Sequence, residues 1–97
     1  MATRFTWNEE KDLANRRKHG LSFATAALVF DDYFVISHQD RDVEGEQRWT
    51  TIGRVGAVIL TVAHTVIDIE GEEVIRLISA RKATPSERKL YEEGEDN

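Results

Sequence analysis

The fold is decided by residues 47–80, which read QRWTTIGRVGAVILTVAHTVIDIEGEEVIRLISA. This stretch is rich in valine, isoleucine, threonine and aromatic residues, which favour strands. Together with an earlier run of the same kind, it predicts strands over 33–38, 47–53, 57–65 and 73–80. The segments 53–56 and 69–72 each contain glycine and are typical of hairpin turns. We therefore expect these strands to pair antiparallel, as a meander.

Helix signals lie on both sides of the strands. After a short edge strand over 4–7, Asn8 is suited to cap a first helix that runs to about Lys18 and stops at Gly20. Ser22 begins a second helix that ends near 31–32, with one buried face formed by Phe23, Ala26, Ala27 and Phe30. Residues 84–87 (TPSE) form a capping box that starts a last helix through Tyr91. The element order predicts an α+β domain: an antiparallel sheet, two N-terminal helices packed on one face and a short C-terminal helix.

The size and composition of the chain indicate one globular domain over residues 1–97. With 97 residues there is room for a single core, and the 40% of hydrophobic residues is enough to close it. No apolar run is long enough to span a membrane, and residues 1–8 do not resemble a signal peptide, so we expect a soluble, cytoplasmic protein. The absence of cysteine excludes disulfides, thiolate chemistry and cysteine-ligated zinc.

The net charge of -5 is unevenly distributed. Residues 21–47 hold one Lys/Arg and six acids, whereas residues 48–64 hold two Lys/Arg and no acid. Further cations gather at 16–18 and at 81–82. Two interpretations stay open at this point: a basic site on an acidic body, or ordinary solvated faces.

Several kinds of site are not supported by the motifs. His19, His38 and His64 are too far apart in the sequence for the local spacings of metal sites, so we expect no metal and no cofactor. The chain also lacks a phosphate-binding glycine loop and a G-x-S-x-G motif.

Arg76 is unusual because it interrupts an apolar strand. On a regular strand it would share a face with Val74, Ile78 and Ala80, while Arg81 would lie on the other face with Leu77. Such an arginine lies at the rim of the sheet, pairs with a carboxylate or binds an anionic ligand.

Two further features have both a functional and a structural interpretation. Arg81 and Lys82 follow the last strand and are suited to bind phosphate, or they are the solvated entry to the last helix. Trp49 offers a ring on which a nucleotide base can stack, or it belongs to the core.

Several segments together resemble the BrnT family of toxins. They are FTWN at 5–8, NRRKHGLSF at 15–23, VFDD at 29–32, Arg48 with Ile52-Gly53, and ISARKAT at 78–84, followed by Glu87, Arg88 and Tyr91. The resemblance implies a RelE-like fold and a ribonuclease toxin of a bacterial type II toxin–antitoxin system, which cleaves RNA and so inhibits translation and growth. It also implies a BrnA-type ribbon-helix-helix antitoxin, through which the complex binds operator DNA. A dimeric antitoxin would bring two toxin copies together.

Metal-free RNA cleavage needs a base for the 2′-hydroxyl proton, cations for the scissile phosphate and a proton donor for the leaving oxygen. We assign phosphate stabilisation to Arg81 and Arg76, with Arg17 and Lys18 approaching from the end of the first helix, and Lys18 carrying the proton. The candidates for substrate binding are Trp49, Arg48, Arg54, Lys82 and His64. His19 and His64 are secondary candidates for the proton steps. This interpretation requires Lys18, Arg76 and Arg81 to meet in one anion-binding pocket.

The sequence also departs from the family pattern. Gln47-Arg48 stands where members often have Glu-Arg, and the arginine that often follows a His-Thr pair is missing after His64-Thr65. Two hypotheses follow: an RNA-cleaving toxin, or an inactive homologue that binds the antitoxin as a co-repressor. A simple DNA-binding protein is disfavoured by the acidic charge and the lack of a helix-turn-helix pattern.

Overall fold

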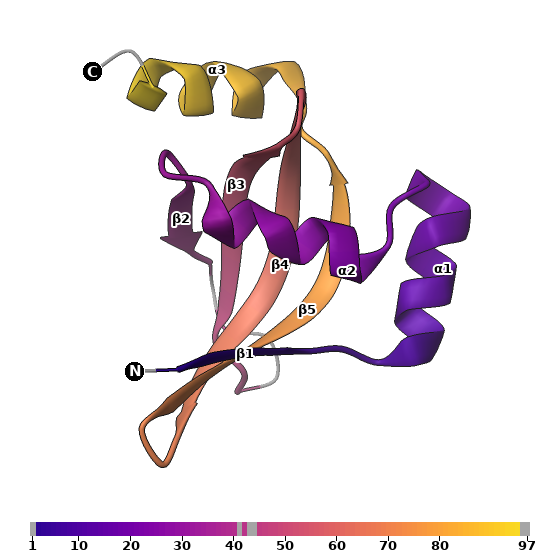
Figure 1. Cartoon of the computed structure of the whole chain (residues 1–97), viewed down its shortest axis with the longest axis vertical. Coiled ribbons are helices and arrows are strands. Elements are labelled where there is room, and N and C mark those ends of the chain that lie inside the picture. The colour runs from indigo at the N-terminus through magenta and orange to yellow at the C-terminus, as the bar shows by residue number, and fades with distance from the viewer. Residues whose placement is uncertain (1, 41, 43–44, 96–97) are drawn as a thin grey trace.

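The protein is described by a computed structural model that covers residues 2–40, 42 and 45–95. Within these residues, one five-stranded sheet is accompanied by three α-helices and a 3-10 helix (Figure 1). In chain order the elements are β1 (Thr3–Thr6), α1 (Glu9–His19), α2 (Phe23–Ala26), the 3-10 helix η1 (Ala27–Asp31), β2 (Ile36–Gln39), β3 (Arg48–Val55), β4 (Val58–Ile69), β5 (Glu72–Lys82) and α3 (Pro85–Glu95). None of the described helices combines the length and apolar character needed to cross a membrane.

The sheet is mixed, with the strand order β1-β5-β4-β3-β2. The meander of β2 to β5 is antiparallel, as expected, but β1 pairs parallel to β5. The prediction of an antiparallel sheet is therefore wrong for β1. Its partner is about seventy residues away, with Thr3 opposite Glu73, so the local sequence of β1 gives no information on the direction of pairing.

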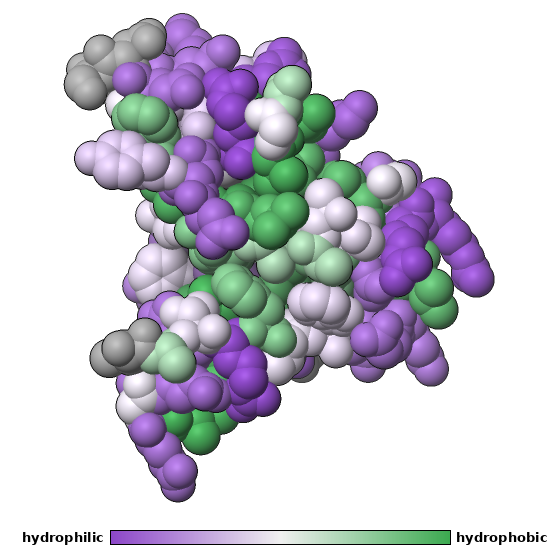
Figure 2. Space-filling model, viewed as in Figure 1, coloured by the Kyte–Doolittle hydropathy of each residue, from purple (hydrophilic) through white to green (hydrophobic). Residues whose placement is uncertain are grey.

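The main core lies between the sheet and the segment formed by α2 and η1. Phe23, Ala26 and Val29 from this segment pack on buried strand residues, among them Leu60 and Leu77. Figure 2 shows that hydrophobic side chains also reach the surface across the middle of this side of the molecule. We call this side of the sheet the inner face and the opposite side the outer face.

Helix α1 does not pack on the inner face as predicted. It stands beside the edge of β5, as Figure 1 shows. Its one large apolar residue, Leu13, is 47% exposed, and its buried residues are Asp12 and Asn15. The Asn15 side chain donates to the carbonyl oxygens of Leu21 and Ala80 and accepts from the Ala80 N–H. A helix without an apolar stripe cannot bury a face, so it is held by hydrogen bonds instead.

A β-bulge in β5 changes which side chains share a face. Leu77 lies opposite His64 and Ser79 lies opposite Ala63, so Ile78 is an extra residue in the register. Because strand side chains alternate, one extra residue reverses the alternation beyond it. The predicted division of faces is therefore wrong: Arg76 and Arg81 both lie on the outer face, opposite Thr65 and Thr61.

Helix α3 covers one end of the outer face. Ile52, Ile59 and Ala83 form a second core cluster there with Tyr91 of α3. The predicted capping box is confirmed, because the Glu87 N–H donates to the Thr84 hydroxyl and the Thr84 N–H donates to the Glu87 carboxylate. The rest of the outer face is not covered by a described helix.

Candidate functional site

A row of polar side chains crosses the outer face. Arg48 of β3 lies opposite Thr65 of β4, which lies opposite Arg76 of β5, which lies opposite Thr6 of β1. Directly opposite residues project from the same face and their Cβ atoms are roughly 5 Å apart. The pairing of the strands therefore brings two arginines to either side of one threonine.

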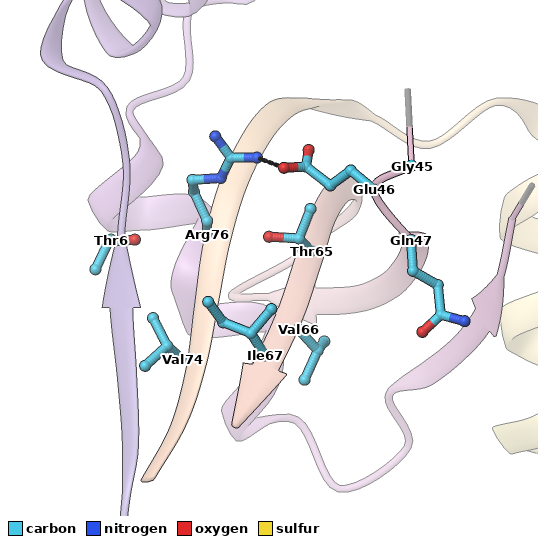
Figure 3. Close-up of a pocket in the computed structure, with 9 residues that line it drawn as sticks. All are labelled: Thr6, Gly45, Glu46, Gln47, Thr65, Val66, Ile67, Val74 and Arg76. Atoms are coloured by element: carbon cyan, nitrogen blue, oxygen red, sulfur yellow. Dashed lines mark ion pairs between the residues drawn. The ribbon is translucent and has the colours of Figure 1, made fainter. Parts of the chain in front are cut away.

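The row borders a pocket of about 600 Å³, shown in Figure 3. It is lined by polar and apolar side chains, namely Thr6, Glu46, Gln47, Thr65, Val66, Ile67, Val74 and Arg76, and by Gly45. The side chains of Glu46 and Arg76 extend toward each other above Thr65. One carboxylate oxygen of Glu46 lies 2.5 Å from Nη2 of Arg76, and the other lies 3.9 Å from Nη2 of Arg48. Of the three alternatives for Arg76, the structure shows pairing with a carboxylate.

One hydrogen-bond donor of Arg48, its Nε atom, is buried without a partner among the described residues. A buried donor without a partner costs free energy and calls for an explanation, such as a ligand or a water. The guanidinium of Arg48 is thus only weakly engaged in the free chain.

Arg81 lies farther along the same face but is firmly paired. Its two terminal nitrogens lie 2.7 Å and 3.0 Å from the two carboxylate oxygens of Glu87 in α3. Glu87 also accepts from the Thr61 hydroxyl. The hydrogen bond from Arg81 is the main cause that lowers the pKa of Glu87 to about 2. An incoming phosphate would have to replace this carboxylate on Arg81.

Arg54 and Lys82 line a separate pocket of about 290 Å³ beside α3. The Arg54 guanidinium binds the Glu95 carboxylate at 3.1 Å and lies over the ring of Tyr91, 5.5 Å from its centre. The Tyr91 hydroxyl in turn donates to Asp32 at 2.5 Å. These contacts hold α3 against the sheet, so Arg54 has an evident structural role.

Arg17 and Lys18 lie in the last turn of α1, beside the β5 edge, and both are exposed. Neither lines the pocket that contains Arg76, and neither pairs with a described carboxylate. Their clustering has a local explanation, because cations are favoured at a helix C-terminus. The expected single pocket of Lys18, Arg76 and Arg81 does not form in this structure: Lys18 lies apart, and each arginine holds an acid.

Trp49 and His64 lie on the inner face, opposite each other on β3 and β4. They line a pocket of about 280 Å³ together with Phe30, whose ring meets the imidazole edge to face at 5.0 Å. Trp49 is half-buried, so its exposure is intermediate between that of a core residue and that of a ring open to base stacking. These two candidates are thus separated by the sheet from Arg48 and Arg76.

The His64 side chain belongs to a chain of hydrogen bonds that the sequence does not reveal. The imidazole is 2% exposed, and burial lowers its pKa. Its Nδ1 donates to the Thr65 carbonyl at 3.3 Å, so Nε2 accepts from the Thr51 hydroxyl at 2.6 Å. The Ser37 hydroxyl lies 2.7 Å from that of Thr51. The neutral imidazole is therefore held in one tautomer.

Glu46 is the site residue that the sequence analysis missed. The only signal for it in the sequence is its position two residues before Arg48, within an acidic segment for which two interpretations stayed open. Among the described residues, no cluster of three or more histidine, aspartate or glutamate side chains is placed to hold a metal ion.

The chain matches a known protein family. A family model described as the ribonuclease toxin, BrnT, of a type II toxin–antitoxin system matches residues 7–87. The match includes Arg48, Thr65 and Arg76 of the row on the outer face, the paired Arg81 and Glu87, and the inner-face pocket. No curated protein matches the chain.

Proposed function

Because the chain belongs to the BrnT family of ribonuclease toxins of type II toxin–antitoxin systems, we propose that it is a metal-independent endoribonuclease. It cleaves RNA in the cytoplasm and thereby inhibits translation and growth. A BrnA-type ribbon-helix-helix antitoxin neutralises it, and the complex reaches operator DNA only through the antitoxin. Two toxin copies are brought together where the antitoxin is a dimer.

The observation that carries this proposal is the alignment of Arg48, Thr65 and Arg76 on an open part of the outer face. Guanidinium groups bind phosphate oxygens in two-point contacts and stabilise the charge that develops on phosphorus. The neighbouring pocket has room for a nucleotide and offers both polar and apolar walls. Arg81 lies on the same face because of the bulge at Ile78, so it is positioned to contact the RNA backbone once Glu87 is replaced.

The remaining candidates would act away from the scissile phosphate. Trp49 and His64 would bind a base on the inner face, and Arg54 and Lys82 would contact the backbone beside α3. Arg17 and Lys18 would approach along the β5 edge. A role of Lys18 in proton transfer requires the RNA to pass this edge.

A second candidate function is favoured by the ion pairs. Arg76 is bound by Glu46 and Arg81 by Glu87. These two cations of the candidate site are therefore already neutralised in the free chain. This arrangement fits an inactive homologue that serves as the antitoxin-binding co-repressor.

Incubation of the antitoxin-free protein with RNA in EDTA separates the two functions. Fragments are expected for the nuclease, and intact RNA at high protein excess would favour the co-repressor. Cleavage that is lost only in EDTA would reveal a metal requirement. In cells, Arg81→Ala is expected to abolish growth arrest while the variant stays folded, and an unchanged arrest would remove Arg81 from the site.

A further inference from the structure

The Arg48–Arg76 row lacks the base that we predicted for it. Lys18 does not line the adjoining pocket. Of the described residues that do line it, Glu46 alone carries a side chain that can act as a general base. RNA cleavage through the 2′-hydroxyl requires such an acceptor within hydrogen-bond reach of the reacting group.

We propose that Glu46 is the general base of the reaction, an inference that rests on the proposed ribonuclease function. Its carboxylate takes the proton from the 2′-hydroxyl while the 2′-oxygen forms a bond to phosphorus and the bond to the 5′-oxygen breaks. The products are a 2′,3′-cyclic phosphate and a free 5′-hydroxyl. The leaving 5′-oxygen needs one proton, and Glu46 has taken up one. Water on the open face carries this proton from Glu46 to the 5′-oxygen.

The geometry gives the two carboxylate oxygens different environments. One is held by Arg76 at 2.5 Å, which fixes the position of the side chain. The other is 3.9 Å from Arg48, beyond hydrogen-bond distance, so its lone pairs remain available. The group is thus oriented by one arginine and open to substrate next to the other.

Substrate binding itself would change the contacts of this base. In the free chain one carboxylate oxygen of Glu46 is held by Arg76. A phosphodiester bound by Arg48 and Arg76 competes for the same N–H groups and brings a negative charge beside the carboxylate. The scissile phosphate therefore weakens the contact between Arg76 and Glu46 and leaves the carboxylate available to the 2′-hydroxyl. The Nη2 atom of Arg48 lies 3.9 Å from Glu46, beyond hydrogen-bond distance, which leaves donor capacity for that phosphate.

The ion pair of Glu72 with Arg4 provides a matched control. Glu72 lies at the start of β5, its side chain is 39% exposed compared with 41% for Glu46, and its carboxylate is 2.7 Å from Arg4. Glu72 does not line the pocket and has no described second arginine beside it. A general effect of losing a surface ion pair would therefore appear equally in Glu72→Gln.

The test measures single-turnover cleavage of a short RNA and, separately, binding of the same RNA with 2′-O-methyl groups, which cannot react. Glu46→Gln is expected to slow cleavage by about 100-fold or more, the usual contribution of a general base. Binding of the methylated RNA is expected to stay equal or to become tighter, because Arg76 is released. Glu72→Gln is expected to cleave at the wild-type rate. Formate is expected to restore part of the rate of Glu46→Ala.

Three outcomes would count against the proposal. If the wild-type protein cleaves the RNA and Glu46→Gln cleaves it at an equal or higher rate, Glu46 only competes with the substrate. If Glu46→Gln binds the methylated RNA more weakly, and this accounts for the whole loss of cleavage rate, the role of Glu46 is structural. Intact RNA with the wild-type protein would instead overturn the proposed ribonuclease function, and Glu46 would then have no reaction to serve.

Discussion

Arg81 and Glu87 face each other in a two-point ion pair that joins the end of β5 to the first turn of α3, with N–O distances of 2.7 Å and 3.0 Å. The same carboxylate accepts from the Thr84 N–H and from the Thr61 hydroxyl. One side chain thus caps a helix, ties it to two strands and neutralises an arginine that we assign to the RNA-binding face. The pair therefore links stability of the fold to access to the site.

Replacement of Glu87 should reveal this link as an acid-dependent loss of stability. The pKa of Glu87 is lowered from 4.5 to about 2 in the folded chain, so its contribution is present above about pH 4.5 and is lost as the pH falls toward 2. Solvent around the partly exposed pair reduces the contribution, and we expect Glu87→Gln to lower the free energy of unfolding by about 1–2 kcal/mol at pH 7. Urea unfolding at pH 7 and pH 3 measures it. The exposed Glu92→Gln in the same helix is the control, and a loss that stays equal at both pH values would contradict the assignment.

His64 should make the fold less stable in weak acid. Burial lowers the pKa of its imidazole below the ordinary 6.5, so below pH 6.5 the unfolded chain binds more protons than the folded chain. The free energy of unfolding of the wild type should therefore fall between pH 7.5 and pH 5.5. His64→Gln is expected to be less stable at pH 7.5 but to show a weaker dependence on pH. If this variant keeps the full wild-type slope while the exposed His38→Gln removes it, the origin is His38.

Asn15 should be more important for stability than its position on a polar helix suggests. Its amide satisfies both backbone groups of Ala80 and the carbonyl of Leu21. Truncation leaves buried groups without partners, and we expect Asn15→Ala to cost about 2–3 kcal/mol. Asn15→Asp should also destabilise, because a carboxylate accepts from Ala80 but cannot donate. Thermal or urea unfolding tests this, with Arg17→Ala of the same helix as the control, which is expected to remain near the wild type.

Gly53 should not tolerate a side chain. A Cβ atom at this position would lie 2.9 Å from both the Cβ and the carbonyl oxygen of Val29 in η1. We expect Gly53→Ala to force β3 and η1 apart at a cost of about 1–3 kcal/mol. Gly94→Ala is the control, since no atom lies within 4 Å of a Cβ there and alanine favours a helix. Equal stabilities of the two variants would show that the packing of η1 on β3 adjusts without cost.

The sequence by itself determined the features that depend on residues a few positions apart. Asn8 and Ser22 cap helices as predicted, because each side chain bonds a backbone N–H three residues ahead. The capping box at Thr84 and Glu87 follows the same rule, and Gly20 ends α1 in the left-handed conformation. The hairpins were also predicted from the sequence. Gly53, however, was assigned to a turn and lies inside β3. The resemblance to the BrnT family was likewise present in the sequence alone, and the family match confirms it.

The tertiary structure decided everything that depends on the register between distant segments. The parallel pairing of β1 with β5, the bulge at Ile78 and the approach of Glu46 to Arg76 all depend on residues that lie 13 to 70 positions apart in the sequence. Strand side chains alternate, so one extra residue in β5 moved Arg81 to the same face as Arg76. No local pattern encodes that choice, because the energies that set it come from partners that meet only when the sheet has formed.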